Sequence, residues 1–260
     1  MVKKTLVTLA LLAALVPFVS RTAAAQSSAQ RPVPAVGWNI LAPAHPPVML
    51  DHPKHVDTIP PYCSPGCLFY GGDIDTTKSN ADGFANGNTV NVPLTTTFSP
   101  FTVPVGQKWA VTALFGNNVG DTGVLDPAQA SWTIAIDMNN GSPGTIIASG
   151  TTTATAVPTG RVAFGRTEYT VKTALGTTVH LGPGNYWESV VPQCTNSGDS
   201  GCTAQWFLDN TFGLNAVGPA EPQFHGFFNS AFFGFTYTPL CEVSTLGCNA
   251  SSAGVIGRGE

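Results

Sequence analysis

The sequence predicts an all-β protein, a jelly-roll-like antiparallel β-sandwich with local disulfides. Runs rich in threonine, valine and aromatic residues alternate with Gly, Asn and Pro about every 8–15 residues from Leu68 to Pro239. No stretch of that region has a clear helical period. The six cysteines form three pairs that are close in the sequence: Cys63/Cys67, Cys194/Cys202 and Cys241/Cys248.

The N-terminus has the features of a secretory signal peptide, residues 1–25. Lys3 and Lys4 precede the apolar run TLVTLALLAALVPFV, and Ala23–Ala25 provide small residues for cleavage. The apolar run is shorter than the ~20 residues that a membrane-spanning helix needs. We therefore expect a secreted, extracellular or periplasmic protein without a membrane span in the mature chain.

Three further segments follow. Residues 26–61 are dense in proline and are predicted to form an extended linker. Residues 62–239 are predicted to form the sandwich, and residues 240–260 a small polar tail with one disulfide. The expected strands are 89–98, 108–117, 130–139, 144–153, 161–165, 168–175, 177–182, 185–192, 204–210 and 230–239.

Alternation within two of these strands predicts the faces that build the core. Side chains at alternate positions from Trp109 to Phe115 are expected to share one face, as are those from Trp132 to Met138. Two such faces would pack as stacked sheets around one core.

The charge of the chain argues against nucleic acid as a partner. The whole chain carries 11 basic and 15 acidic residues. Removal of the leader takes away Lys3, Lys4 and Arg21, so 8 − 15 gives a net charge of −7. Nucleic-acid binding needs a basic surface instead.

The cysteine pairs are predicted to be disulfides, because exported proteins oxidise their thiols. Each bridge would close a short loop and so restrict the unfolded chain less than a long one would. Zinc binding is the alternative, but two of the pairs are spaced more widely than structural zinc sites usually are.

The stretch YGGDIDTTKSNADGFANG, residues 70–87, is a candidate calcium loop. Asp73, Asp75 and Asp82 offer the carboxylate oxygens that calcium prefers. The stretch does not fit an EF-hand: counted from Asp73, position six is Lys78 instead of glycine, and with Gly83 at position six, position one is Lys78. The alternative is a turn in which Asp and Asn side chains bond their own backbone.

Catalytic signals are weak. Gly198–Gly201 has the order Gly-Asp-Ser-Gly of a protease nucleophile turn, but the histidine context is missing. Glu168 and Glu188 lie in neighbouring predicted strands and form the one pair that could hydrolyse polysaccharide, provided that they face each other across a cleft. No catalytic residue is assigned.

Aromatic side chains in the predicted strands are candidates for a sugar-binding platform, since a flat ring can stack on a pyranose. Core packing is the ordinary role of such residues. The three candidate ligand-binding residues are Trp206, Tyr237 and Trp187.

Several strings along the chain resemble those of secreted bacterial β-sandwich proteins of the PEP-CTERM or choice-of-anchor type. The strings are YGGDID…ADGFANG, FTVPVGQKWAVTALFGNN, LGPGNYWESVVP, WFLDNTFG and FFNSAFFGFTY. The resemblance implies an exported protein of the cell surface or matrix and carries over no catalytic residue. The chain lacks the anchor segment that many of that group have, which favours release.

Together these features predict a secreted, non-enzymatic β-sandwich that interacts with the cell surface or the extracellular matrix. A glycan or an extracellular protein would be its partner, with calcium as the one candidate cofactor. The alternatives are a secreted polysaccharide hydrolase and a structural subunit of an extracellular assembly.

Overall fold

The computed structural model describes residues 61–75, 83–89, 94–120, 127–194, 205–219, 225–230, 236–243 and 251–260. The chain divides into the units Met1–Pro34 and Ala35–Glu260, and all described residues belong to the second. The predicted signal peptide and the linker up to residue 60 therefore lie outside the described residues.

The prediction of an all-β fold is confirmed. Strands dominate the described part of the chain, and its one α-helix has four residues. The elements are η1 (Pro61–Cys63), β1 (Cys67–Tyr70), β2 (Gly83–Ala85), β3 (Thr95–Val103), β4 (Trp109–Gly120), β5 (Gln129–Ile136), β6 (Thr145–Ala163), β7 (Arg166–Leu181), β8 (Gly184–Gln193), β9 (Trp206–Asp209), β10 (Phe227–Ser230), β11 (Thr238–Pro239), α1 (Leu240–Val243) and β12 (Ala253–Gly259).

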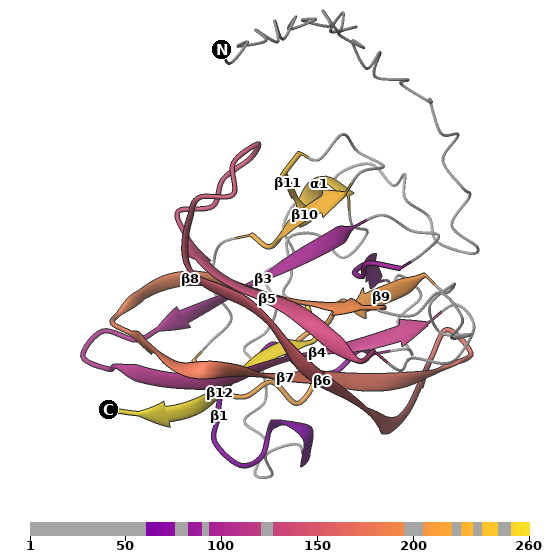
Figure 1. Ribbon diagram of the computed structural model, residues 1–260, viewed down its shortest axis with the longest axis horizontal. Coiled ribbons are helices and arrows are strands. Elements are labelled where there is room, and N and C mark those ends of the chain that lie inside the picture. The colour runs from indigo at the N-terminus through magenta and orange to yellow at the C-terminus, as the bar shows by residue number, and fades with distance from the viewer. Residues whose placement is uncertain are drawn as a thin grey trace, which may run out of the picture. The chain divides into compact units, whose positions relative to one another are not determined.

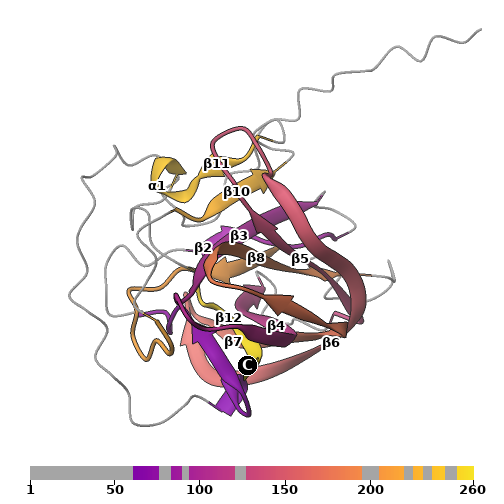
Figure 2. The same cartoon turned by 90° about the vertical axis from the view of Figure 1, so that its left-hand side faces the viewer.

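The strands form one continuous antiparallel path that folds into two layers. The order is β1-β12-β4-β7-β6-β5-β8-β3-β10-β11. Strand β9 pairs with β4 at Asn118–Gly120, beyond the residues that pair with β12, and β2 pairs with β9. Figure 2 shows β3, β8 and β5 on one level and β12, β4 and β7 on another, with β6 beside both. The first half of β6 pairs with β5 and its second half with β7 (Figure 1), so β6 joins the layers.

The prediction of two strands at 144–153 and 161–165 is wrong, because β6 runs through both. It passes Pro158 with a register shift before Val162 and does not end there. The finer classification as a jelly roll stays a prediction.

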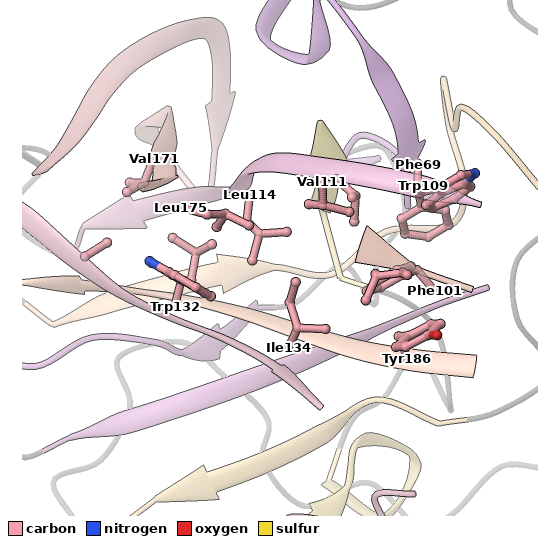
Figure 3. Close-up of a cluster of buried hydrophobic side chains, with 14 of the residues drawn as sticks. Phe69, Phe101, Trp109, Val111, Leu114, Trp132, Ile134, Val171, Leu175 and Tyr186 are labelled. Atoms are coloured by element: carbon pink, nitrogen blue, oxygen red, sulfur yellow. The ribbon is translucent and has the colours of Figure 1, made fainter. Parts of the chain in front are cut away.

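The main core lies between the two layers (Figure 3). Phe101, Trp132 and Ile134 from one layer meet Val111 and Leu114 from the other. The ring of Phe101 stacks between two aromatic neighbours, Trp109 at 6.1 Å and Tyr186 at 5.5 Å between ring centroids. Burial of such large side chains provides most of the driving force for folding.

The predicted shared face of β4 is wrong, because a bulge divides the strand. The pairing of β4 with β12 and its pairing with β7 both shift register at Thr112. Against β7, the shift lies between Val111 and Ala113. Val111 therefore faces the main core, whereas Phe115 faces outward and packs on Tyr70. One extra residue turns every following side chain to the opposite face.

The prediction that residues 240–260 form only a polar tail is wrong in part, because this segment contains the strand β12. This strand lies between β1 and β4, and Val255 is fully buried in the main core. Glycine is required where neighbouring chains come close. A Cβ at Gly257 would lie 2.2 Å from the carbonyl oxygen of Ala110, and one at Gly254 would lie 2.6 Å from the ring of Phe115. The glycines that permit this packing also give the segment the composition of a tail.

One predicted disulfide is confirmed between Cys63 and Cys67. Cys194 and Cys241 are disulfide-bonded as well. Their predicted partners, Cys202 and Cys248, lie outside the described residues. Among the residues that the structure describes, no helix has the length and apolar character to cross a membrane.

The close approach of β12 to β4 gives a first prediction. Gly257→Val should destabilise the fold by about 1–3 kcal/mol, because the new side chain meets backbone atoms that cannot rotate away. Gly259→Val is the matched control, since a Cβ there meets nothing within 4 Å. Urea unfolding followed by tryptophan fluorescence measures both. Equal midpoints for the two variants would contradict the packing of β12.

Candidate functional site

The most densely connected polar cluster lies where the chain enters the fold, on the outward face of the layer formed by β12, β4 and β7. We call it the Arg161 cluster and define it by five side chains. Asp73 is its centre and is only 5% exposed. The members are Tyr62, Tyr70, Asp73, Arg161 and Glu168.

Arg161 carries the positive charge of the cluster and neutralises carboxylates from two distant parts of the chain. Its Nη1 lies 3.0 Å from Oδ1 of Asp73, and its Nη2 contacts Oε2 of Glu168. The guanidinium also lies over the ring of Tyr62, 5.2 Å from the centroid. Thr159 donates a hydrogen bond to Glu168 Oε2 at 2.6 Å. The tip of the β6–β7 hairpin is thereby fixed to residues 61–75, which we call the entry segment.

Asp73 accepts hydrogen bonds on both carboxylate oxygens. Tyr62 and Tyr70 donate to Oδ1, the latter at 2.5 Å, and Asn215 donates to Oδ2 at 2.8 Å. Tyr70 in turn accepts a hydrogen bond from Asn117 of β4 at 2.8 Å. The carboxylate therefore links the entry segment, the β4 face and the 211–218 segment.

The phenols of the cluster hold their protons tightly. Burial, together with the hydrogen bond to Asp73, raises the pKa of Tyr62 above its ordinary value. Burial and the Asp73 charge also raise the pKa of Tyr70. Burial alone would lower the pKa of Arg161, but its neighbours Tyr70, Glu168 and Asp73 raise it. At neutral pH the phenols are donors and the guanidinium stays charged, so the cluster suits fixed structure and not proton transfer.

The predicted calcium loop is only partly described. The Asp73 carboxylate pairs with Arg161 and accepts hydrogen bonds from Tyr62 and Tyr70. Asp75 is half-buried and makes a contact of its own, and Asp82 lies outside the described residues. Among the side chains that the structure describes, no group of three or more His, Cys, Asp or Glu could hold a metal ion. A role of Asp73 as a calcium ligand is therefore not supported.

The proposed hydrolytic pair, Glu168 and Glu188, is not brought together. Glu168 lies opposite Val119 of β4, whereas Glu188 lies between Ser99 of β3 and Ile134 of β5, in the other layer. The two side chains are 0% and 1% exposed. Glu168 is bound by Arg161, and Glu188 faces the main core. The requirement that they face each other across a cleft is not met.

Glu188 is a buried acid without an ionic partner in the described part of the chain. Its Oε1 and the hydroxyl of Ser99, directly opposite on β3, are both buried without a hydrogen bond. Burial raises the pKa of Glu188 well above its ordinary value. Burial of this kind favours the neutral acid over the carboxylate.

Two of the three aromatic candidates, Trp206 and Trp187, are parts of the core. Trp206 is 1% exposed and belongs to the main cluster. Trp187 is 7% exposed, packs on Phe227 and donates its indole N–H to the carbonyl of His225 at 2.6 Å. Tyr237 is half-buried beside this cluster. Neither tryptophan has the exposed ring that stacking on a sugar requires, so burial argues against their predicted role.

Sequence reasoning missed Arg161 and its tyrosine partners. One signal was present: residues 138–160 contain no charged residue, and Arg161 ends that run inside a predicted strand. A lone arginine in such a setting indicates a carboxylate partner, but the partner itself depends on contacts across 88 residues, from Asp73 to Arg161 (161 − 73).

No protein-family model, curated protein or solved structure matches the chain significantly. The resemblance to secreted β-sandwich proteins of the PEP-CTERM or choice-of-anchor type therefore stays a prediction.

The Arg161 cluster gives a second prediction. Arg161→Met should destabilise the protein by on the order of 3 kcal/mol, because two buried carboxylates lose their counter-charge. Arg166→Met, an exposed arginine on the same hairpin, is the matched control and should change stability by less than about 0.5 kcal/mol. Chemical unfolding measures both. Similar losses for the two variants would mean that the ion pairs do not hold the entry segment.

The buried acid gives a third prediction, which concerns pH. The folded-state pKa of Glu188 is raised, so folding favours the protonated form, and stability falls as pH rises above about 4.3 toward the folded-state pKa. Glu188→Gln cannot ionise and should therefore gain on the wild type by up to about 1.4 kcal/mol per pH unit in that window. Unfolding free energies at pH 4, 6 and 8 test this.

The control for this prediction is Glu242→Gln, because Glu242 is exposed. Its difference from the wild type should stay flat from pH 6 to pH 8. A difference for Glu188→Gln that is the same at all three pH values would show that Glu188 ionises as easily in the fold as in the unfolded chain.

Proposed function

We propose that the chain is a secreted, non-enzymatic binding protein that attaches to cell-surface or extracellular-matrix material through one outward sheet face. The observation that carries the proposal is a row of exposed, uncharged hydroxyl side chains on β6 beside further polar side chains on β5. We call this surface the hydroxyl face. Its members are Gln129, Ser131, Thr133, Ser149, Thr151, Thr153 and Thr155.

The chemistry of the fold supports binding over catalysis. Glu168 and Glu188, the carboxyls on which a hydrolase would depend, are committed to an ion pair and to the core. A rigid β scaffold with a polar face open to solvent suits recognition, since a preorganised surface loses little entropy on binding.

The leader and the disulfides support an extracellular location. Residues 1–25 have the pattern of a secretory signal, and disulfides persist in oxidising compartments. Three disulfide-bonded positions, Cys63, Cys194 and Cys241, lie in separate parts of the described chain. Location outside the cytoplasm is part of the proposal.

The structural-subunit alternative has less support. An open edge strand would favour assembly by strand addition. At the β1 edge, Tyr70 exchanges two backbone hydrogen bonds with Val217, at 2.9 and 3.0 Å. At the other end of the path, β11 has two residues. Neither end offers a long edge for a second chain.

A retention assay tests the proposed function. Purified full chain is incubated with isolated cell-wall and extracellular-matrix material, and bound protein and released reducing sugars are measured together. We expect saturable binding without sugar release. Sugar release that Glu188→Gln or Glu168→Gln abolishes would overturn the proposal in favour of the hydrolase, and absence of binding would overturn it as well.

A further inference from the structure

The hydroxyl face follows directly from the alternation of β5 and β6. Trp132 and Ile134 of β5, with Ala154 of β6, point into the main core. Side chains at the intervening positions must therefore point outward. On β6 all four outward hydroxyl residues are exposed, from Ser149 to Thr155, and the three outward residues of β5 are half-buried.

Strand pairing places these side chains in regular rows. Ser131 lies opposite Thr151, Thr133 opposite Ser149 and Gln129 opposite Thr153. Neighbouring strands are about 4.8 Å apart, and alternate residues along a strand about 6.7 Å apart. The hydroxyls of Ser131 and Thr151 lie 2.9 Å apart, within hydrogen-bonding distance across one row. The four hydroxyls of β6 thus follow a line about 20 Å long.

The seven side chains that define the face carry no charge. None of its seven side chains is ionisable, and the nearest strand partner with a charge is Lys172, which lies opposite Thr155 at one end. Anionic ligands such as phosphates or acidic polymers are bound by arginine and lysine, which this face does not contain. Protein interfaces depend on aromatic, methionine and arginine anchors and use serine and threonine little. The composition therefore fits a neutral, hydroxyl-rich ligand.

We propose that the hydroxyl face binds a neutral polysaccharide, laid along β6. This inference rests on the proposed function and names its ligand class. Each threonine hydroxyl both donates and accepts a hydrogen bond, as sugar hydroxyls do, and its methyl group contacts the apolar faces of the sugar rings. A single net hydrogen bond contributes only about 0.5–1.5 kcal/mol. A polymer that engages several hydroxyls in line gains from their sum, whereas a monosaccharide does not.

The aromatic residues have a supporting role in this arrangement. Trp132 lies on the core side of β5, and its ring would be only 2.9 Å from a Cβ at Gly150 of β6. The close packing of the two strands holds the rows of the hydroxyl face in register. Binding through stacked rings, predicted from the sequence, is replaced by binding through hydroxyls.

A depletion assay with matched variants tests the ligand class. Full chain is mixed with insoluble cellulose, with chitin and with polygalacturonate, and unbound protein is measured. The double variant Thr153→Val and Thr155→Val removes two exposed hydroxyls but keeps the shape and β propensity of the side chains. It should weaken binding to a neutral polymer by roughly tenfold or more.

The control carries the same substitutions at Thr177 and Thr178, which are exposed at the far end of β7. It should bind like the wild type. Thr151→Lys, which introduces a charge into the same row, provides an independent variant and should also weaken binding. Circular dichroism and melting temperature verify that each variant folds.

The outcomes separate the inference from the function on which it rests. Binding to cellulose or chitin that the β6 variants lose and the β7 control keeps supports both. Retention on matrix material that is unchanged in the β6 variants overturns the hydroxyl face and leaves the proposed function standing. Preference for polygalacturonate overturns the neutral ligand. Failure to bind any matrix material overturns the function itself.

Discussion

The contact between Arg161 and its two carboxylates determines how the chain enters the fold. Asp73 belongs to the entry segment and Glu168 to β7, and they share one guanidinium. Removing such charges from water is costly, so the pairs contribute more to specifying an arrangement than to net stability. Here the arrangement fixes Tyr70 over Phe115 and covers the outward face of β4. The disulfide turn at Cys63–Cys67 is held on β12, where Gly257 donates a backbone hydrogen bond to Gly66 at 2.8 Å.

The long strand β6 explains why one sheet surface stays exposed. Strand β6 pairs with β5 of one layer and β7 of the other, so its inward side chains contribute to the core between the layers. In the described part of the chain, no further layer covers its outward side chains. The entry segment covers the outward face of β4, and Met138 and Phe227 cover the outward side of Trp187. The outward residues of β6 from Ser149 to Thr155 stay exposed, and those of β5 are half-buried. Their threonines combine high β propensity with solubility, which suits a strand exposed on one side.

Alternation in the sequence was enough to predict an all-β fold and the positions of strands such as β4, β5 and β8. It was not enough to predict which way each side chain points. The bulge at Thr112 in β4 sends Phe115 to the opposite face from Val111, and no local signal marks that extra residue. Ile134 and Met138 likewise belong to different clusters, Ile134 to the main core and Met138 to the cluster around Trp187. The backbone changes direction between them at Asp137, which has a positive φ of 56°.

The candidate site was predicted less well than the fold, because its contacts join distant parts of the chain. Asp73 was singled out as a carboxylate in a turn-rich loop, and its partner Arg161 could not be inferred from spacing. Trp187 and Trp206 were correctly assigned to strands, but the expectation that their rings are exposed was wrong. The threonine run of β6 was visible as a strand, but its open face depends on which neighbours cover the other strands.

The place of β12 has a consequence for how this protein is made. Ile256 pairs with Ala113, 143 residues earlier (256 − 113), and with Cys67, 189 residues earlier (256 − 67). Pairings this remote in sequence fold slowly, since a long loop must close before any contact is gained. During synthesis, the part of β4 from Trp109 to Gly116 has no partner on its β12 side until the ribosome has passed residue 259. The pairings of β1 and of this part of β4 with β12 therefore form only after β12 has been translated.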